Sequence, residues 1–224
     1  MVFHEITHFS IFTRIVSALL IGGIIGLERG AKNRPAGLRT YMLVCVGSCL
    51  IMLTNQYIYQ FTGAGDPMRL GAQVVSGIGF LGAGTIVVTK HNQIKGLTTA
   101  AGLWTAAGVG LALGIGFYEA AITAAFSIYI VLTIVQKLEN RVQMKNRFLE
   151  IYIEIDQTLH LNELTQQLRE LDFSIENIQF EADFGLDTNS HALVLSLKSD
   201  KKEDHHVLLR KIKKIEGITY AEEL

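Results

Sequence analysis

Five apolar runs fill most of the first 136 residues, and they restrict the fold more than any other feature. A helix that crosses the hydrocarbon core of a bilayer needs roughly 20 consecutive, mostly apolar residues. We therefore predict a membrane all-α bundle of about five transmembrane helices. The predicted spans are Phe9–Leu27, Leu38–Leu53, Leu70–Val88, Leu97–Gly116 and Tyr118–Gln136, of which the second is the shortest.

The composition changes after the fifth run and indicates a domain boundary. Hydrophobic residues make up 49% of the chain and the mean hydropathy is +0.31, values too high for an ordinary soluble protein of this size. Residues 1–147 carry 12 Lys and Arg against 5 Asp and Glu, whereas residues 148–224 carry 8 against 16. We predict a transmembrane domain over residues 1–137, a basic juxtamembrane linker over 138–147 and a soluble domain over 148–224.

Basic residues in the short connections predict the orientation, because cytoplasmic loops hold an excess of Lys and Arg. Ten of them fall on one side: Arg29, Lys32, Arg34, Arg39, Lys90, Lys95, Lys137, Arg141, Lys145 and Arg147. The other side has Arg69. Arg14 lies close to the outer end of the first run, where its side chain is expected to snorkel to the headgroups. The chain should therefore start outside and end in the cytoplasm.

Small residues recur at helical spacing within the apolar runs. Lipid gives no hydrophobic drive between helices, so close packing depends on small residues that let backbones approach. The residues expected to serve helix packing are Gly22, Gly26, Gly77, Gly79, Gly82, Gly84, Gly102, Ala106, Gly110 and Gly114. The third run is expected to be the crowded centre of the bundle. Cys45 and Cys49 are interpreted as small buried hydrophobes, and Trp104 as a packing residue.

Two short segments resemble each other at the starts of the second and fourth runs. They are Gly37-Leu38-Arg39-Thr40 and Gly96-Leu97-Thr98-Thr99, and each follows a basic connection. Both pairs of runs pass inward and then outward, so a true similarity would be a parallel repeat about an axis along the membrane normal. Chance is the alternative explanation.

Alternating patterns replace the apolar runs after residue 147. Phe148–Ile155 alternates as a half-buried strand, and Leu161, Leu164, Leu168 and Leu171 follow at helical spacing. Further strands are predicted at Ser174–Glu181, His191–Lys198 and Ile218–Glu222, with a turn at 185–190 and a second helix over Val207–Ile215. The order βαββαβ is that of an α+β ferredoxin-like domain.

The entry to the last strand, Ile215-Glu216-Gly217-Ile218, resembles ACT domains, with Gly217 as the helix C-cap. The resemblance implies pairing through the sheets and, in some members, amino-acid binding. Ligand-binding members usually have a glycine in the turn after the first strand, where this chain has Asp156-Gln157-Thr158. We therefore expect dimerisation or partner contact, and a homo-oligomer, rather than amino-acid sensing.

Three stretches of the membrane part resemble the MgtC/SapB family. They are GGIIGLER over residues 22–29, PAGLRT over 35–40, and DPMRLGAQVVSGIGFLGAG over 66–84 with KGLTTAA over 95–101. The resemblance implies a protein of the bacterial cytoplasmic membrane linked to magnesium homeostasis and, in pathogens, to survival inside host cells. It also implies that membrane lipids and other membrane proteins, the ATP synthase among them, are partners.

The family motifs mark the candidate functional residues, which are Glu28, Arg29, Arg39, Thr40, Asp66, Arg69, Gln73, Lys95, Thr98 and Thr99. A Glu28–Arg39 pair would either fix two helices together or form a charged cytoplasmic mouth. The basic residues Arg29, Lys32 and Arg34 would alternatively bind lipid phosphates.

Asp66 precedes Pro67 at the start of the third run, where it suits a helix N-cap. The functional alternative is that Asp66, Arg69 and Gln73, which follow helical spacing, line an outer vestibule.

The same residues narrow the classes of function. Mg²⁺ is held by oxygen ligands, so a carrier would normally have carboxylates inside its spans, whereas Glu28, Asp66 and Glu119 all lie at predicted span ends. The sequence has no constellation of nucleophile and base, so we expect neither an enzyme nor a cofactor or metal site. The acidic soluble domain disfavours nucleic acid. Our first hypothesis is a non-enzymatic membrane regulator, and the alternative is a transporter or channel for Mg²⁺ or another small solute.

The predicted orientation is tested by reporter fusions placed after Leu224. A fluorescent protein that folds in the cytoplasm should be active there, and alkaline phosphatase, which needs the exterior, should be inactive. The opposite pattern of activities would mean an even number of crossings or an inverted chain.

Overall fold

In the computed structural model the chain divides into two units, Met1–Gln136 and Lys137–Leu224. The structure describes residues 5–89, 93–143, 148–156, 159–181, 190–199 and 205–223. The residues named above that lie outside these ranges are Lys90, Lys145, Arg147, Gln157, Thr158 and Leu224, together with the predicted turn over 185–189.

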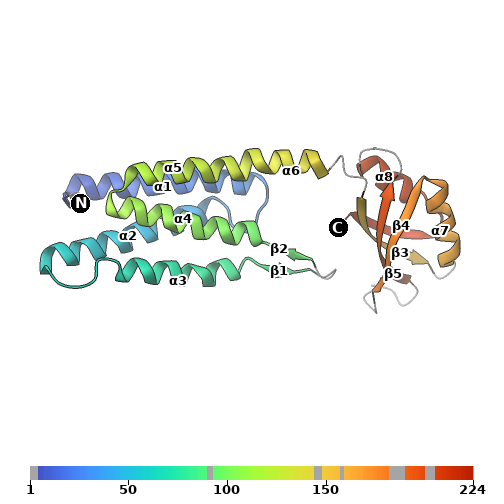
Figure 1. The fold of residues 1–224 in the computed structure, drawn as a ribbon, viewed down its shortest axis with the longest axis horizontal. Helices are drawn as coiled ribbons and strands as arrows, with labels where there is room; N and C mark the ends of the chain where they lie inside the picture. Colours follow the sequence, from blue (N-terminus) through green and yellow to red (C-terminus); the bar gives the residue numbers. More distant parts are fainter. Residues whose placement is uncertain are drawn as a thin grey trace. The chain divides into compact units, whose positions relative to one another are not determined.

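The first unit is a helical bundle (Figure 1). Its helices are α1 (His8–Ala31), α2 (Leu38–Thr62), α3 (Arg69–Ala83), α4 (Leu97–Ile115) and α5 (Tyr118–Ile130). The last of them continues through a π-helical segment, η1 (Val131–Val135), into α6 (Gln136–Gln143). α1 begins and α5 ends at opposite ends of the bundle (Figure 1).

Four helices of the described residues are long and apolar enough to cross a membrane: His8–Ala31, Leu38–Thr62, Leu97–Ile115 and Tyr118–Glu139. The third predicted span is shorter than expected, because α3 has 15 residues and ends at Ala83. A helix of that length is about 22 Å long, against about 30 Å for the hydrocarbon core.

The second predicted span ends too early at Leu53, because α2 continues for nine more residues to Thr62. Polar side chains in this extension lowered the apolar signal on which the prediction depended. Two of them, Asn55 and Gln56, are buried inside the bundle. A left-handed Gly63 (φ 64°) then ends the helix.

The centre of the bundle is α2, packed between glycines of α1 and α4. A Cβ atom on Gly22 of α1 would lie 2.7 Å from the carbonyl oxygen of Tyr41, and one on Gly114 of α4 would lie 2.6 Å from that of Cys49. A Cβ on Gly110 would contact the carbonyl oxygen of Cys45. Both cysteines are free and fully buried, as small residues in a tight seam.

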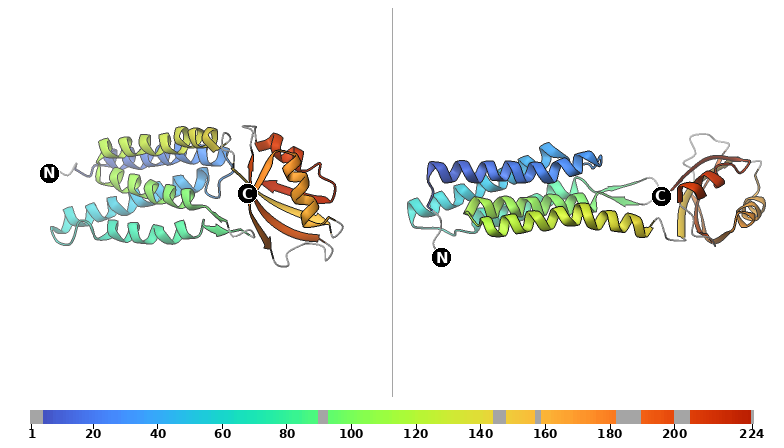
Figure 2. Two further views of the ribbon diagram at one scale, coloured as in Figure 1. Left: turned by 45° about the vertical axis from the view of Figure 1, so that its right-hand side comes forward. Right: turned by 90° about the horizontal axis from the view of Figure 1, so that it is seen from above.

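The third helix is not the crowded centre that its glycine content suggested. Figure 2 shows α3 at the edge of the bundle. A Cβ on Gly77 or Gly79 would meet no atom within 4 Å, whereas one on Gly82 would make ordinary contact with Ala100 of α4. Trp104 is also not a packing residue within this unit, since 52% of its surface is exposed.

The two similar segments each start a helix, but their glycines differ in backbone conformation: Gly37 is extended (φ −116°) and Gly96 is left-handed. Gly37 and Gly96 occupy the N-cap positions of α2 and α4. Before Gly96, a short antiparallel hairpin of β1 (Val87–Val88) and β2 (Ile94–Lys95) links α3 to α4. Gly96 has φ 100°, and a Cβ there would overlap the carbonyl oxygen of Thr85, so the turn requires glycine.

The second unit is an antiparallel sheet with two helices, and the predicted order of its elements is confirmed. They are β3 (Phe148–Asp156), α7 (Leu161–Glu170), β4 (Phe173–Glu181), β5 (Ser190–Ser199), α8 (His205–Ile212) and β6 (Ile218–Glu223). The sheet order is β4-β5-β3-β6. Leu164 and Leu168 of α7 and Leu208 and Ile212 of α8 share one core with the inward side of β3, so both helices cover the same face of the sheet.

The other face of the sheet carries a pattern of tyrosines and glutamates on β3 and β6. Tyr152 pairs with Glu222 across the strands, and Glu154 with Tyr220. The Tyr152 hydroxyl donates to Glu154 at 2.9 Å and the Tyr220 hydroxyl to Glu222 at 2.8 Å. The hydrogen bond to Glu222 raises the pKa of the Tyr220 phenol. This face is acidic and has no helix over it among the described residues.

The glycines of α1 and α4 that contact the backbone of α2 form a glycine seam. We predict that a large side chain destabilises the bundle at these positions and not at open ones. Gly110→Leu should destabilise the bundle by at least the ~1–3 kcal/mol typical of overpacking, because a backbone carbonyl cannot move aside. Gly108→Leu is the matched control, since a Cβ there meets no atom within 4 Å. We expect a lower unfolding temperature in detergent for the first variant and no decrease for the second. Equal melting temperatures would contradict the seam.

Candidate functional site

Arg14 is fully buried and joins three helices at one end of the bundle. Its Nη1 donates to Gln56 Oε1 of α2 at 2.7 Å and to the carbonyl oxygen of Gly114 at 2.8 Å. Gly114 lies in the last turn of α4, where carbonyl groups lack helical partners and the helix dipole is negative. The expectation that Arg14 snorkels to the headgroups is therefore wrong, because the bundle itself provides acceptors for its charge.

A second polar cluster lies at the opposite end of α1. Glu28 forms ion pairs with Lys32 and, at 3.7 Å, with Arg29. Lys32 Nζ also donates to Gln136 Oε1 at 2.8 Å and to the carbonyl oxygen of Leu132 at 3.0 Å. Leu132 belongs to the π-helical segment η1, a local widening that often marks a functional position. The cluster thus ties the end of α1 to the long fifth helix.

Arg29 and Tyr41 place further polar atoms within this cluster. Their side chains are 1% and 0% exposed, and Tyr41 packs against Gly26 of α1, two residues before Glu28. Among the described residues, Arg29 Nε and Nη1 and the Tyr41 hydroxyl have no hydrogen-bond partner. The donors of Arg29 and Tyr41 and the carboxylate of Glu28 are therefore concentrated at one buried place. Burying such groups costs free energy, so we expect them to serve helix packing or function.

The Glu28–Arg39 pair is absent from the described residues, because Arg39 is exposed and Glu28 faces Arg29 and Lys32. Burial also removes Arg29 from the set that could bind lipid phosphates, whereas Arg34 remains exposed.

Asp66, Arg69 and Gln73 come together at the turn between α2 and α3. They line a cavity of about 440 Å³ with Asn55 and Tyr59 of α2, as the vestibule hypothesis expected. Asp66 is not the N-cap of α3, a position that Met68 holds; its Oδ1 instead accepts the Met68 amide at 2.8 Å. The cavity therefore opens beside a turn that Asp66 helps to fix.

The other candidate residues lie apart from these clusters. Thr40, Lys95 and Thr98 are exposed, at the start of α2, in β2 and in the first turn of α4. Thr99 is 2% exposed and packs inside the bundle.

Comparison with known proteins agrees with these features. The sequence pattern of the MgtC family matches residues 15–141. The chain belongs to the MgtC family. The matched segment contains the Glu28 cluster, the Asp66 cavity, the hairpin and all of α2 to α5.

Three relatives differ in how much of the chain they share. An uncharacterised protein of Haemophilus influenzae is 33% identical over 211 residues, 91% of this chain and 89% of its own length. YhiD of Escherichia coli K12, named as a candidate magnesium transporter, is 36% identical over 143 residues, 62% of this chain and 66% of its own length. SapB of Bacillus subtilis is 33% identical over 181 residues, 76% of this chain and 77% of its own length.

Sequence reasoning missed the roles of Arg14, Gln56 and Tyr41 in the MgtC-type bundle. A signal was present for the first two, because an arginine inside an apolar run needs acceptors, and polar residues follow the second run at a similar depth. Tyr41 gave no such signal, since its burial depends on Gly102 of α4, whose Cβ would contact the Tyr41 hydroxyl.

The Glu28 cluster predicts a large cost for removing its only carboxylate. Glu28→Gln leaves the buried Arg29 without a counter-charge, and breaking such a pair typically costs about 3–5 kcal/mol. Glu119→Gln is the matched control, because Glu119 is an exposed carboxylate of the same unit. Thermal unfolding in detergent should show a much lower midpoint for the first variant alone. A midpoint equal to that of the control would show that the cluster does not stabilise the bundle.

Proposed function

We propose that this protein is a non-enzymatic regulator of other membrane proteins in the bacterial cytoplasmic membrane, linked to magnesium homeostasis. In this proposal α3 crosses the membrane with the four longer apolar helices, the chain starts outside, and the C-terminal domain is ACT-like and cytoplasmic. The basic connections support the orientation. Membership of the MgtC family supports the link to magnesium, since YhiD is named for it.

The observation that carries this proposal is the contrast between a filled interior and an unpartnered outer surface. The small residues of α1 and α4 are used against α2, and the buried charges are used to fasten helices. Outside, α4 presents Trp104, 52% exposed, and Gly108, and α5 presents Phe126, 65% exposed. A large exposed aromatic beside a small residue suits contact with another transmembrane helix.

The C-terminal domain supports a role in assembly within the same proposal. The sheet face that carries Glu154, Tyr220 and Glu222 has no helix of its own unit over it among the described residues, and Tyr220 is 47% exposed there while Tyr152 is buried beside it. Aromatic side chains with polar ends are enriched where protein surfaces meet. We propose that this face contacts a second copy or a partner, which would make the protein a homo-oligomer.

Transport remains the second candidate, because the Asp66 cavity contains a carboxylate and one relative is named as a candidate magnesium transporter. Mg²⁺ binds through one or two carboxylates while keeping several waters. Asp66 is the only acidic residue among those that line this cavity.

Partner binding is tested at the outer face of α4. Trp104→Ala should lower the recovery of co-purified membrane proteins, the ATP synthase among them, by about tenfold, which corresponds to ~1.4 kcal/mol. Gly108→Leu should act in the same direction without unfolding the bundle. Gly79→Leu, an equally open position on α3, is the control. Gly102 and Gly110 are unsuitable for this test, because their seam is used inside the bundle. Unchanged recovery for both α4 variants would refute this contact surface.

Transport is tested with purified protein in liposomes loaded with a Mg²⁺-sensitive dye. The regulator proposal predicts uptake no faster than in empty liposomes. Saturable uptake that Asp66→Asn abolishes, and that Arg39→Ala at an exposed site away from the cavity leaves intact, would establish the transporter instead.

A further inference from the structure

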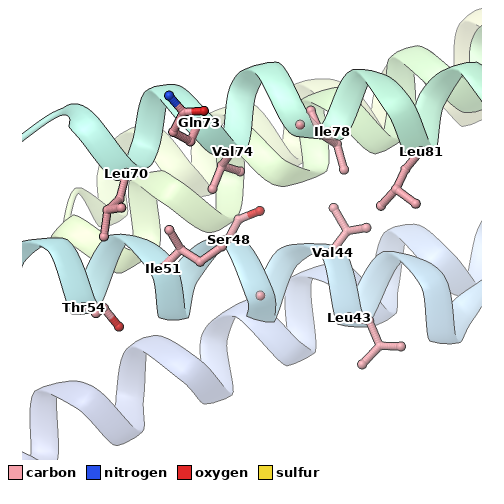
Figure 3. Close-up of a pocket in the computed structure, with 12 residues that line it drawn as sticks. Leu43, Val44, Ser48, Ile51, Thr54, Leu70, Gln73, Val74, Ile78 and Leu81 are labelled. Carbon is pink, nitrogen blue, oxygen red and sulfur yellow. The ribbon is translucent and has the colours of Figure 1, made fainter.

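A second cavity extends along α2 and α3. Figure 3 shows it between the two helices, with Val44 and Ile51 on one wall and Val74 and Ile78 on the other. Its volume is about 620 Å³, within the range of sites that hold small molecules. All of the residues that line it come from α2 and α3, so it is a groove on the side of the bundle and not a channel through its centre.

The groove exists because small residues face it from both walls. A Cβ on Gly47 of α2 or on Gly77 of α3 would meet no atom within 4 Å. The two helices still touch, for example where a Cβ on Gly71 would lie 3.4 Å from Met52 Sδ. The Thr54 hydroxyl, on the same wall as Gly47, donates to the carbonyl oxygen of Leu50, so it has little left to offer a ligand. Ser48 also lines the groove, and apart from Gln73 the rest of its lining is glycine and aliphatic side chains, so an occupant of this part should be mainly apolar.

The apolar groove adjoins the polar cavity at the start of α3. Leu70 and Gln73 line both of them. A molecule that fills both spaces needs an apolar chain on one side of Gln73 and a polar group on the other. This is the construction of a membrane lipid, with the polar group placed at the turn that joins α2 to α3.

The charges of the polar cavity indicate which head group fits. Arg69 and Asp66 both line it, and neither forms an ion pair with another residue of the described ranges. Asp66 Oδ1 accepts the Met68 amide, which leaves Oδ2 for a donor. Arg69 matches a phosphate and Asp66 matches an ammonium group that can donate hydrogen bonds.

We propose that this composite site binds phosphatidylethanolamine, with one acyl chain in the groove between α2 and α3, the phosphate at Arg69 and the ammonium at Asp66. A partner helix fits the observations less well, because it would not account for a pair of opposite charges at one end of an apolar groove. The site is independent of the proposed regulatory contact, which uses the outer face of α4.

Native mass spectrometry of the full chain in detergent tests the site, with phosphatidylethanolamine, phosphatidylcholine and phosphatidylglycerol added at equal concentrations. Phosphatidylethanolamine should be retained several-fold more than phosphatidylcholine, whose head group donates no hydrogen bond, and more than phosphatidylglycerol, which has no cation for Asp66. Asp66→Asn should remove the preference over phosphatidylcholine, because asparagine keeps the turn but not the charge. Arg69→Gln should lower the retention of all three lipids.

Variants that fill the groove distinguish a specific lipid-binding site from lipid that merely surrounds the protein. Gly77→Leu should lower retention of phosphatidylethanolamine about tenfold, and Gly47→Leu, on the facing wall, should do the same if the first variant fails to fold. Gly79→Leu is the matched control, because Gly79 is equally open but does not line the groove. Retention that both groove variants leave unchanged would mean surrounding lipid only and would overturn the proposal. Equal or better retention of phosphatidylglycerol, or cross-linking of position 77 to a protein helix in place of lipid, would overturn it as well.

Discussion

The contact of α2 with glycines on both of its sides is the interaction on which the rest of the bundle depends. In lipid the helices gain nothing by hiding apolar surface from water, so they associate where backbones can approach and many atoms can touch. Gly22 and Gly26 of α1 and Gly110 and Gly114 of α4 bring those helices onto the backbone of α2. The seam fixes which faces are inward, and the positions of the buried charges follow from it.

Buried charges are tolerated at the two ends of this seam because the packed helices supply their partners. Arg14 finds a side-chain amide and a free carbonyl at the end of α4, and Glu28 finds two cations. Each of these groups would be costly in lipid by itself. Each charged group is therefore stabilised only in the arrangement of helices that the glycine contacts also favour. The polar clusters and the glycine contacts thus specify the same bundle.

The sequence was sufficient to predict properties that depend on each residue's preference for lipid, water or a pleated surface. The order of the C-terminal elements and the start of every apolar helix belong to this group, since local periodicity and the length of each apolar run determine them. The role of each glycine was not predictable in this way. Gly110 and Gly114 are four residues apart and share one helix face, whereas Gly77 and Gly79 are two apart and cannot. Counting small residues therefore predicted closer packing of α3 than the structure has. The role of Arg14 could not be predicted either, because it depends on the last turn of α4 lying beside it.

The open glycines of α3 reflect a helix that packs less tightly against α2 than α1 and α4 do. Only Gly71, Ile78 and Gly82 are buried in α3, against nine residues in α4. α3 is also too short to match the hydrocarbon core by itself, and its glycines take no part in the close contacts of α1 and α4 with the backbone of α2. The same two properties leave a groove beside it and a polar turn at its start. The part of the bundle that the seam does not use is thus the part that is available to bind another component of the membrane.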